Sequence, residues 1–296
     1  AAIAAAEAAS AGVNWTFAPM IDITRDPRWG RIAESLGEDP YLCGQLGAAR
    51  VRGFQGQRLS DKRSIAACAK HFVGYGAVEG GLDYNTANIP ENELRNVYLP
   101  PFKQALDAGV ATFMSSFSDL NGVPAAGNEF LMRQILREEW KFDGFVVSDW
   151  DAIRELTVHG FSANDREAVL EAINAGINME MASSLYKEHM SSLIDEGRID
   201  EQALDELVYD ILKLKFELGL FDNPYTNTRD FPQLVNPEHL ESANLAALRG
   251  CVLLKNDHQV LPLSADDLGS VAVIGPLADD GYEQLGTWVF DGEAQH

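Results

Sequence analysis

Cysteine is scarce in this sequence, and the spacing of the few cysteines excludes two kinds of site. Cys43, Cys68 and Cys251 are the only three in 296 residues. An odd number of widely separated cysteines builds neither a disulfide framework nor a CxxC metal or redox motif. The six histidines show no HExxH or other paired-ligand spacing. We therefore expect no metal and no cofactor, and we expect Cys68, within an apolar run, to be a small core residue.

Basic residues and long apolar runs are also lacking. The 23 Lys and Arg residues stand against 45 Asp and Glu, which gives a formal net charge of -22. Such an excess repels a phosphate backbone, so we expect no nucleic-acid partner. No apolar run reaches the roughly 18 residues of a membrane span, so we expect no membrane insertion. Residues 1–10 lack a basic leader and begin in mid-helix, so we interpret the chain as a piece of a longer polypeptide.

Short apolar runs alternate with helical patterns along the first part of the chain. This alternation is typical of βα units that form a parallel sheet. A doubly wound sheet is the alternative, but no glycine-rich phosphate loop follows any of the runs. Strands are expected at 14–22, 64–72, 110–116, 144–150 and 177–181. Helices are expected at 1–11, 40–53, 91–109 with an interruption at Pro100 and Pro101, 128–140, 165–175, 184–196 and 200–219.

Polar residues stand where the expected strands end. In a (β/α)8 barrel, the carboxyl ends of the strands form the catalytic mouth. We therefore predict an α/β fold, a (β/α)8-type, TIM-like barrel that is N-terminally incomplete by three strands. The polar residues at the strand ends are Asp22, Lys70, His71, Ser115, Ser116, Asp149 and Glu180.

Composition divides the chain into three parts. We expect the barrel in residues 1–221 and a linker, rich in Pro and Asn, in residues 222–237. Residues 238–296 are interpreted as the beginning of a second α/β domain, of sandwich type. In that part a helix is expected at 238–249, with apolar runs at 250–254 and 270–275.

The stretch 141–150 is the centre of this organisation. Its apolar run 145–147 reads as a strand buried on both faces, and Asp149 follows at the carboxyl end beside Trp150. In an isolated Ser-Asp-Trp, the aspartate is more often a helix cap than a catalytic group. A carboxylate at that end of a strand is nevertheless well placed to attack a sugar.

Four motifs in the right order decide between these readings. They closely resemble the signature segments of glycoside hydrolase family 3, and within it the bacterial periplasmic β-glucosidases. The resemblance runs from residue 1 to about residue 288. The segments that carry it are 18–31 with 34–35 and 37–39, 67–72, 121–122, 144–150, and in the second part 253–256 and 271–276.

The resemblance implies a retaining β-glucosidase that removes terminal non-reducing β-D-glucosyl residues. Asp149 is then the nucleophile, which must be ionised and aimed at the anomeric carbon. Cationic and imidazole donors suit the hydroxyls of a sugar. By resemblance, the residues that bind the substrate are Arg31, Lys70, His71, Met114 and Trp150.

Each of these assignments has a structural alternative. Arg31 lies in a loop with Asp26 and Glu34, where it also suits an ion pair. Trp150 suits either the core or stacking on a sugar ring. Glu180 is interpreted as structural, because a group of mouth residues needs its own internal pairing.

The resemblance also implies parts that this sequence does not contain. The family's acid/base glutamate lies in the second domain, beyond residue 296, and an aspartate on an earlier strand clamps the sugar. The implied partners are a small β-glucoside or β-gluco-oligosaccharide and the remainder of the same polypeptide, and a homodimer stays open. The implied location is periplasmic or secreted. The alternatives to a β-glucosidase are a β-xylosidase, an exo-β-glucanase, or a non-catalytic carbohydrate-binding or assembly fragment. The branch that cleaves N-acetylhexosamines is disfavoured because the loop 70–76 has no second histidine.

Overall fold

The computed structural model describes residues 1–231, 236–286 and 288–289. The chain divides into two compact units, Ala1–Asn236 and Pro237–His296, and each is treated by itself. The boundary between them lies inside the predicted linker, residues 222–237.

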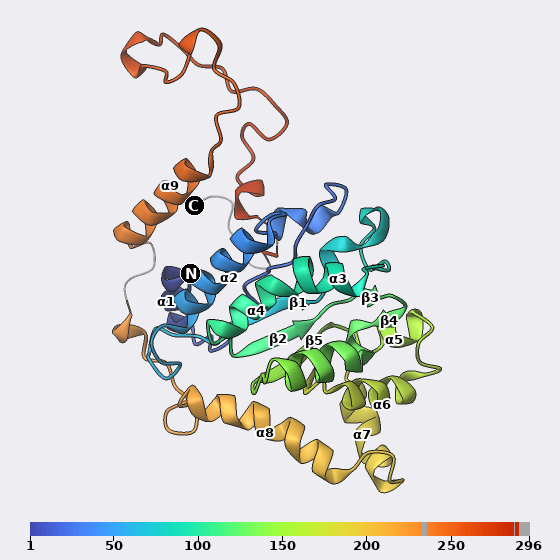
Figure 1. Ribbon diagram of the computed structural model, residues 1–296. Coiled ribbons are helices and arrows are strands. Elements are labelled where there is room, and N and C mark those ends of the chain that lie inside the picture. The colour runs from blue at the N-terminus through green and yellow to red at the C-terminus, as the bar shows by residue number, and fades with distance from the viewer. Residues whose placement is uncertain (232–235, 287, 290–296) are drawn as a thin grey trace. The chain divides into compact units, whose positions relative to one another are not determined.

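A parallel sheet forms the centre of the first unit (Figure 1). Its strands lie side by side in chain order and are connected through helices. Parallel bridges from Trp15 to Ala66 and from Met20 to Lys70 place the segment 14–22 along the other edge of the first strand. This construction is that of a (β/α) barrel, so the predicted fold class is confirmed. The strands, in order, are β1 (Cys68–Phe72), β2 (Thr112–Ser115), β5 (Phe145–Trp150) and β6 (Met179–Met181).

The helices of the first unit follow the expected ranges closely. Side chains at their amino ends explain several of the boundaries: Asp39, Asn128 and Asp200 accept hydrogen bonds from backbone N–H groups two or three residues further on. The helices are α1 (Ala2–Ser10), α2 (Pro40–Gln55), α3 (Glu91–Glu93), α4 (Leu99–Asp107), α5 (Glu155–Val158), α6 (Asp165–Ala175), α7 (Leu185–Asp195) and α8 (Glu201–Glu217), with π-helical segments η4 (Leu94–Tyr98) and η6 (Phe130–Glu139).

Three local features differ from the sequence prediction. The segment 14–22, predicted as a strand, pairs with the sheet only through isolated bridges at Trp15 and Met20. Pro100 and Pro101 do not end the helical segment, which changes just before them from the π-helical η4 to the α-helical α4. A short hairpin, β3 (Asp119–Leu120) and β4 (Val123–Pro124), was not predicted. Its turn is Asn121-Gly122, with φ of 53° and 87°, a strong hairpin signal. The strands on either side of it are too short to show an alternating pattern.

The alternation of side chains along the strands builds a different core on each face of the sheet. Ala67, Phe113 and Val146 belong to the larger core, which contains buried residues of α2, α4, η6 and α6. Cys68 and Met114 point the other way, into a smaller cluster that includes Leu214 of α8. The prediction that Cys68 is a core residue is confirmed.

The second unit contains α9 (Pro237–Gly250), close to the expected helix. The apolar runs at 250–254 and 270–275 are not strands in the described residues. A strand needs a hydrogen-bonding neighbour, and the described part of this unit supplies none. Leu254 and Ile274 accordingly stay 90% exposed.

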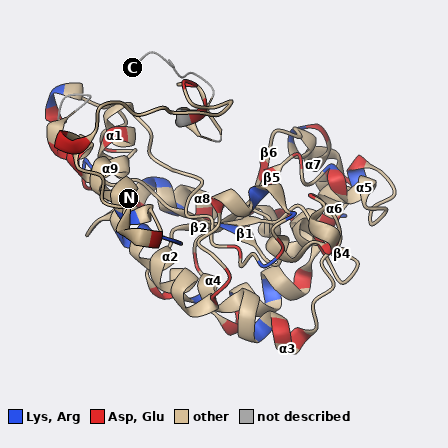
Figure 2. Ribbon diagram, turned by 90° about the horizontal axis from the view of Figure 1, so that it is seen from above, with Lys and Arg blue, Asp and Glu red and all other residues tan. Residues whose placement is uncertain are grey.

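The charged residues are dispersed over the elements. Figure 2 shows acidic and basic positions on many of the described helices. None of the described helices is both long enough and apolar enough to cross a membrane.

Candidate active site

Asp149 ends up at the carboxyl end of the sheet, as the sequence predicts. It is the second-last residue of β5, and it is only 7% exposed. One carboxylate oxygen, Oδ1, accepts a hydrogen bond of 2.7 Å from the backbone N–H of Trp150. The other, Oδ2, is buried and accepts no hydrogen bond from any residue that the structure describes. The neighbouring Ser148 ties β5 to β6, because its Oγ accepts from the N–H of Met181 at 2.9 Å.

His71 connects the parts of this site. It lies at the end of β1 and is completely buried. Its Nδ1 is 2.7 Å from Oδ2 of Asp22, and its backbone N–H donates to the same oxygen at 2.9 Å. Its Nε2 is 3.0 Å from Nη2 of Arg31 and 3.3 Å from Oδ2 of Asp149. Three sequence-predicted residues, Arg31, His71 and Asp149, are therefore in contact.

Arg31 forms the ion pair with Glu34 that the sequence offers as its structural alternative, and its role in sugar binding stays a prediction. Its guanidinium donates to the two carboxylate oxygens of Glu34 at 2.7 and 3.1 Å, and it also reaches His71. The guanidinium lies over the ring of Tyr75, 5.5 Å from the centroid. Burial alone would lower the pKa of Arg31, but the hydrogen bonds and charge of Glu34 raise it above its ordinary value. A permanently charged arginine is thus held beside Asp149.

Two other predicted residues are open to a ligand. Lys70 is half-buried, and no hydrogen bond or ion pair to its ammonium is present within the described residues. Trp150 is 66% exposed, so its indole face is available for stacking. Met114 is different, because it is buried in the smaller cluster with Cys68, and its contact with a sugar stays a prediction.

Two carboxyl groups near the nucleophile have unusual acidity. Burial raises the pKa of Asp22 to about 7. Burial, with the charges of Asp151, Asp149 and Asp83, raises the pKa of Glu155 to about 7 as well. From the sequence alone, Asp22 is a polar residue at a strand end, and Glu155 is not among the expected site residues. The signal for Glu155 was its position on the first helical segment after Asp149, but its burial is a tertiary property.

The remaining carboxylates of interest have structural partners. Glu180 accepts a hydrogen bond of 2.5 Å from Ser183, in agreement with its interpretation as structural. The exposed Arg28 donates hydrogen bonds to both carboxylate oxygens of Asp26. Among the described residues, no group of three His, Cys, Asp or Glu is placed to hold a metal ion.

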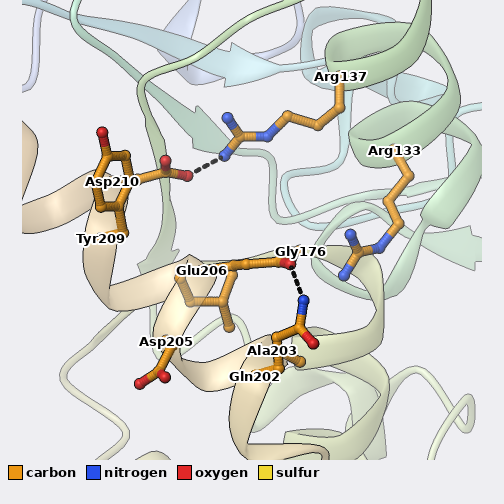
Figure 3. A pocket seen from close by; sticks show the side chains of 10 residues that line it. Arg133, Arg137, Gly176, Gln202, Ala203, Asp205, Glu206, Tyr209 and Asp210 are labelled. Atoms are coloured by element: carbon orange, nitrogen blue, oxygen red, sulfur yellow. Dashed lines mark hydrogen bonds and ion pairs between the residues drawn. The ribbon is translucent and has the colours of Figure 1, made fainter.

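A cavity of about 560 Å³ lies at the other end of the sheet, between η6, Gly176 and α8 (Figure 3). Arg137 crosses it from η6 to Asp210 of α8 at 3.1 Å, and also donates to the carbonyl of Gly144 before β5. These contacts are at the amino ends of the strands, where residues usually stabilise the fold and do not take part in catalysis. The cavity is therefore separate from the group around Asp149.

Comparison with known proteins gives one consistent result. Residues 1–214 match the family described as glycosyl hydrolase family 3 N terminal domain. The chain is 41% identical to the periplasmic β-glucosidase of Salmonella typhimurium over 99% of this chain and 39% of that protein. It is 37% identical to a β-xylosidase of Formosa agariphila over 96% of this chain and 41% of that protein.

A solved structure gives the same picture. The structure of a β-glucosidase from Listeria innocua in complex with glucose superimposes with a TM-score of 0.85 at 42% identity, covering 89% of this chain and 37% of that one. The chain thus spans between 37% and 41% of the length of these three relatives.

Proposed function

Because the chain belongs to glycosyl hydrolase family 3, we propose that its protein is a retaining β-glucosidase in which Asp149 is the nucleophile. One observation carries the proposal. Asp149 has a buried oxygen with no hydrogen-bond donor among the described residues, and this oxygen and the charged Arg31 both lie against Nε2 of His71. A carboxylate that is anchored through one oxygen and bare at the other is prepared for attack.

The reaction proceeds by two displacements. Oδ2 of Asp149 forms a bond to the anomeric carbon while the bond from that carbon to the leaving oxygen breaks, and a general acid gives a proton to that oxygen. Water then attacks the anomeric carbon, the conjugate base takes its proton, and Asp149 is released as a carboxylate. We place the acid/base in a part of the protein outside these 296 residues, because the chain spans only 37–41% of the length of its relatives.

The sugar is held by the groups around the nucleophile. Lys70 donates from its free ammonium, Arg31 and His71 line the buried side, and Trp150 stacks its exposed indole on the ring. Met114 is buried in the smaller cluster, so its part in this proposal is to support the site from the core. A pure carbohydrate-binding role is less well supported, since binding alone does not require a bare, buried carboxylate.

The relatives support glucose as the first sugar and an extracytoplasmic location. One similar structure is named as a complex with glucose, and one similar protein is named as periplasmic. A β-xylosidase is the second candidate, because a relative of that name is 37% identical over 96% of the chain. Comparing kcat/KM for nitrophenyl β-glucoside and nitrophenyl β-xyloside decides between them, and a higher value for the xyloside selects the second.

The nucleophile is tested by Asp149→Asn in the full-length protein. Loss of one essential catalytic group typically lowers the rate by about 10⁴-fold or more, so turnover of an aryl β-glucoside should be abolished. Asp210→Asn is the matched control, since it makes the same change at the amino end of the sheet. Near-normal turnover by a folded Asp149→Asn variant would remove Asp149 from this role.

A further inference from the structure

The contact with Arg31 determines which nitrogen of His71 carries the proton. A guanidinium only donates hydrogen bonds, so Nε2 of His71, 3.0 Å from Nη2 of Arg31, must present a lone pair. Burial lowers the pKa of His71 to about 3, so the ring is neutral and has a single proton. That proton is therefore on Nδ1, and it is donated to Oδ2 of Asp22 at 2.7 Å.

The alternative tautomer would change the state of the nucleophile. With its proton on Nε2, His71 would direct a donor at Oδ2 of Asp149, which is 3.3 Å away. A hydrogen bond there draws charge from the attacking oxygen and lowers its nucleophilicity. The same tautomer would also turn an N–H toward Arg31, which has no acceptor to offer. The tautomer thus decides whether the N–H of the imidazole donates its hydrogen bond to Asp22 or to Asp149.

Asp22 supplies the acceptor that favours the first tautomer. It is 1% exposed, and its Oδ2 accepts from both the ring and the backbone of His71. A buried donor left without an acceptor costs about 1–3 kcal/mol. Removing the acceptor at Asp22 would therefore drive the proton to Nε2, where Asp149 accepts it.

We propose that Asp22 is a positioning residue that holds the proton of His71 on Nδ1 and thereby keeps Oδ2 of Asp149 free of a donor. The inference rests on the proposed role of Asp149 as nucleophile. What Asp22 must provide is an acceptor oxygen and not a negative charge. Its pKa of about 7, raised by burial, fits this requirement, because a carboxyl protonated on Oδ1 still accepts through Oδ2.

Two substitutions separate the acceptor from the charge. Asp22→Asn keeps an oxygen where Oδ2 stands, so kcat/KM should stay within about tenfold of the parent enzyme. Asp22→Leu has a similar branched shape without an acceptor. In Asp22→Leu, the rate of the aryloxide burst, which reports formation of the glycosyl-enzyme, should fall by roughly 10²-fold or more, as expected for an imidazole in the wrong tautomer.

A double-mutant cycle excludes a merely structural role. If Asp22 acts through the ring, Asp22→Leu should cause little further loss of activity in a His71→Gln background. Equal fold-losses in the two backgrounds would mean that Asp22 only anchors the backbone of this loop, and the proposal would be wrong.

The tautomer itself is read by NMR of the full-length protein labelled with ¹⁵N-histidine. The resonances of His71 are identified by their absence in His71→Gln. The parent and Asp22→Asn should show a protonated Nδ1 and a bare Nε2, and Asp22→Leu should show the reverse. A proton on Nε2 in the parent would overturn the proposal, even if Asp22→Leu does not fold. Because this readout needs no substrate, it separates failure of this inference from failure of the proposed glucosidase function, which the activity of the parent tests alone.

Discussion

The fork between Arg31 and Glu34 offers a sharp test of how this site is held together. Arg31→Lys keeps the positive charge but removes the planar guanidinium. Arg31 makes hydrogen bonds of 2.7 and 3.1 Å to Glu34 and one of 3.0 Å to His71, and the side chains of the ion pair are only 13% and 14% exposed. The chain contains its own control, because Arg28 makes a similar fork to Asp26 with a side chain that is 70% exposed.

The expected size of the effect follows from the geometry. One ammonium cannot serve Glu34 and His71 together in the same fork, so at least two of the three hydrogen bonds are lost. A hydrogen bond to a charged group contributes about 1.5–3 kcal/mol, and breaking a buried pair typically costs about 3–5 kcal/mol. We therefore expect Arg31→Lys to lower the free energy of unfolding by about 3 kcal/mol. With about 2–4 °C per kcal/mol for a unit of this size, the melting temperature should fall by about 6–12 °C.

Thermal denaturation of the full-length protein and inhibition by glucose measure the two consequences. Arg31→Lys should melt earlier and bind glucose more weakly, whereas Arg28→Lys should do neither, because an exposed pair is screened by solvent. If both lysine variants have the melting temperature and the glucose inhibition of the parent, then a positive charge at position 31 is enough to hold the site together. The reasoning from the hydrogen bonds of the guanidinium would then be refuted.

Three further outcomes are expected. Lys70→Ala should weaken glucose inhibition together with kcat/KM, because a donor to a hydroxyl is lost, and unchanged inhibition would place the sugar elsewhere. The pKa of Glu155, raised by burial and then by neighbouring carboxylates, is about 7 instead of 4.5. Its contribution to stability is thus present below about pH 4.5 and is lost as the pH rises through about 7. In urea titrations, Glu155→Gln should therefore become more stable relative to the parent as the pH rises from about 5 to about 8. A constant difference in stability over this range would contradict the prediction. Gly76→Ala would put a Cβ 2.2 Å from the carbonyl oxygen of Ile23 and should destabilise the protein by about 1–3 kcal/mol, whereas Gly30→Ala meets nothing within 4 Å and should leave the melting temperature unchanged.

Much of the first unit was predictable because its signals are local. The apolar run 145–147 and the polar residues after it predict a buried strand ending at Asp149, and β5 is that strand. The caps at Asp39 and Asp200 predict helix starts for a similar reason, since each side chain bonds to a backbone group within three residues. The apolar run at 270–275 is not a strand in the described residues, because a strand also depends on a hydrogen-bonding partner that can be distant in the chain.

The chemical state of the site was decided by tertiary structure alone. Asp22 and His71 are 49 positions apart, and parallel pairing of the segment 14–22 with the chain at 66–70 brings them to one end of the sheet. The sequence by itself determined that a carboxylate, a histidine and an arginine stand at strand ends and loops of a barrel. It did not determine that Asp22 lies against Nδ1 of His71, or that Arg31 binds Glu34 and His71 together. These properties arise from burial and register between distant segments, which shift a pKa and fix a tautomer only after the chain has folded.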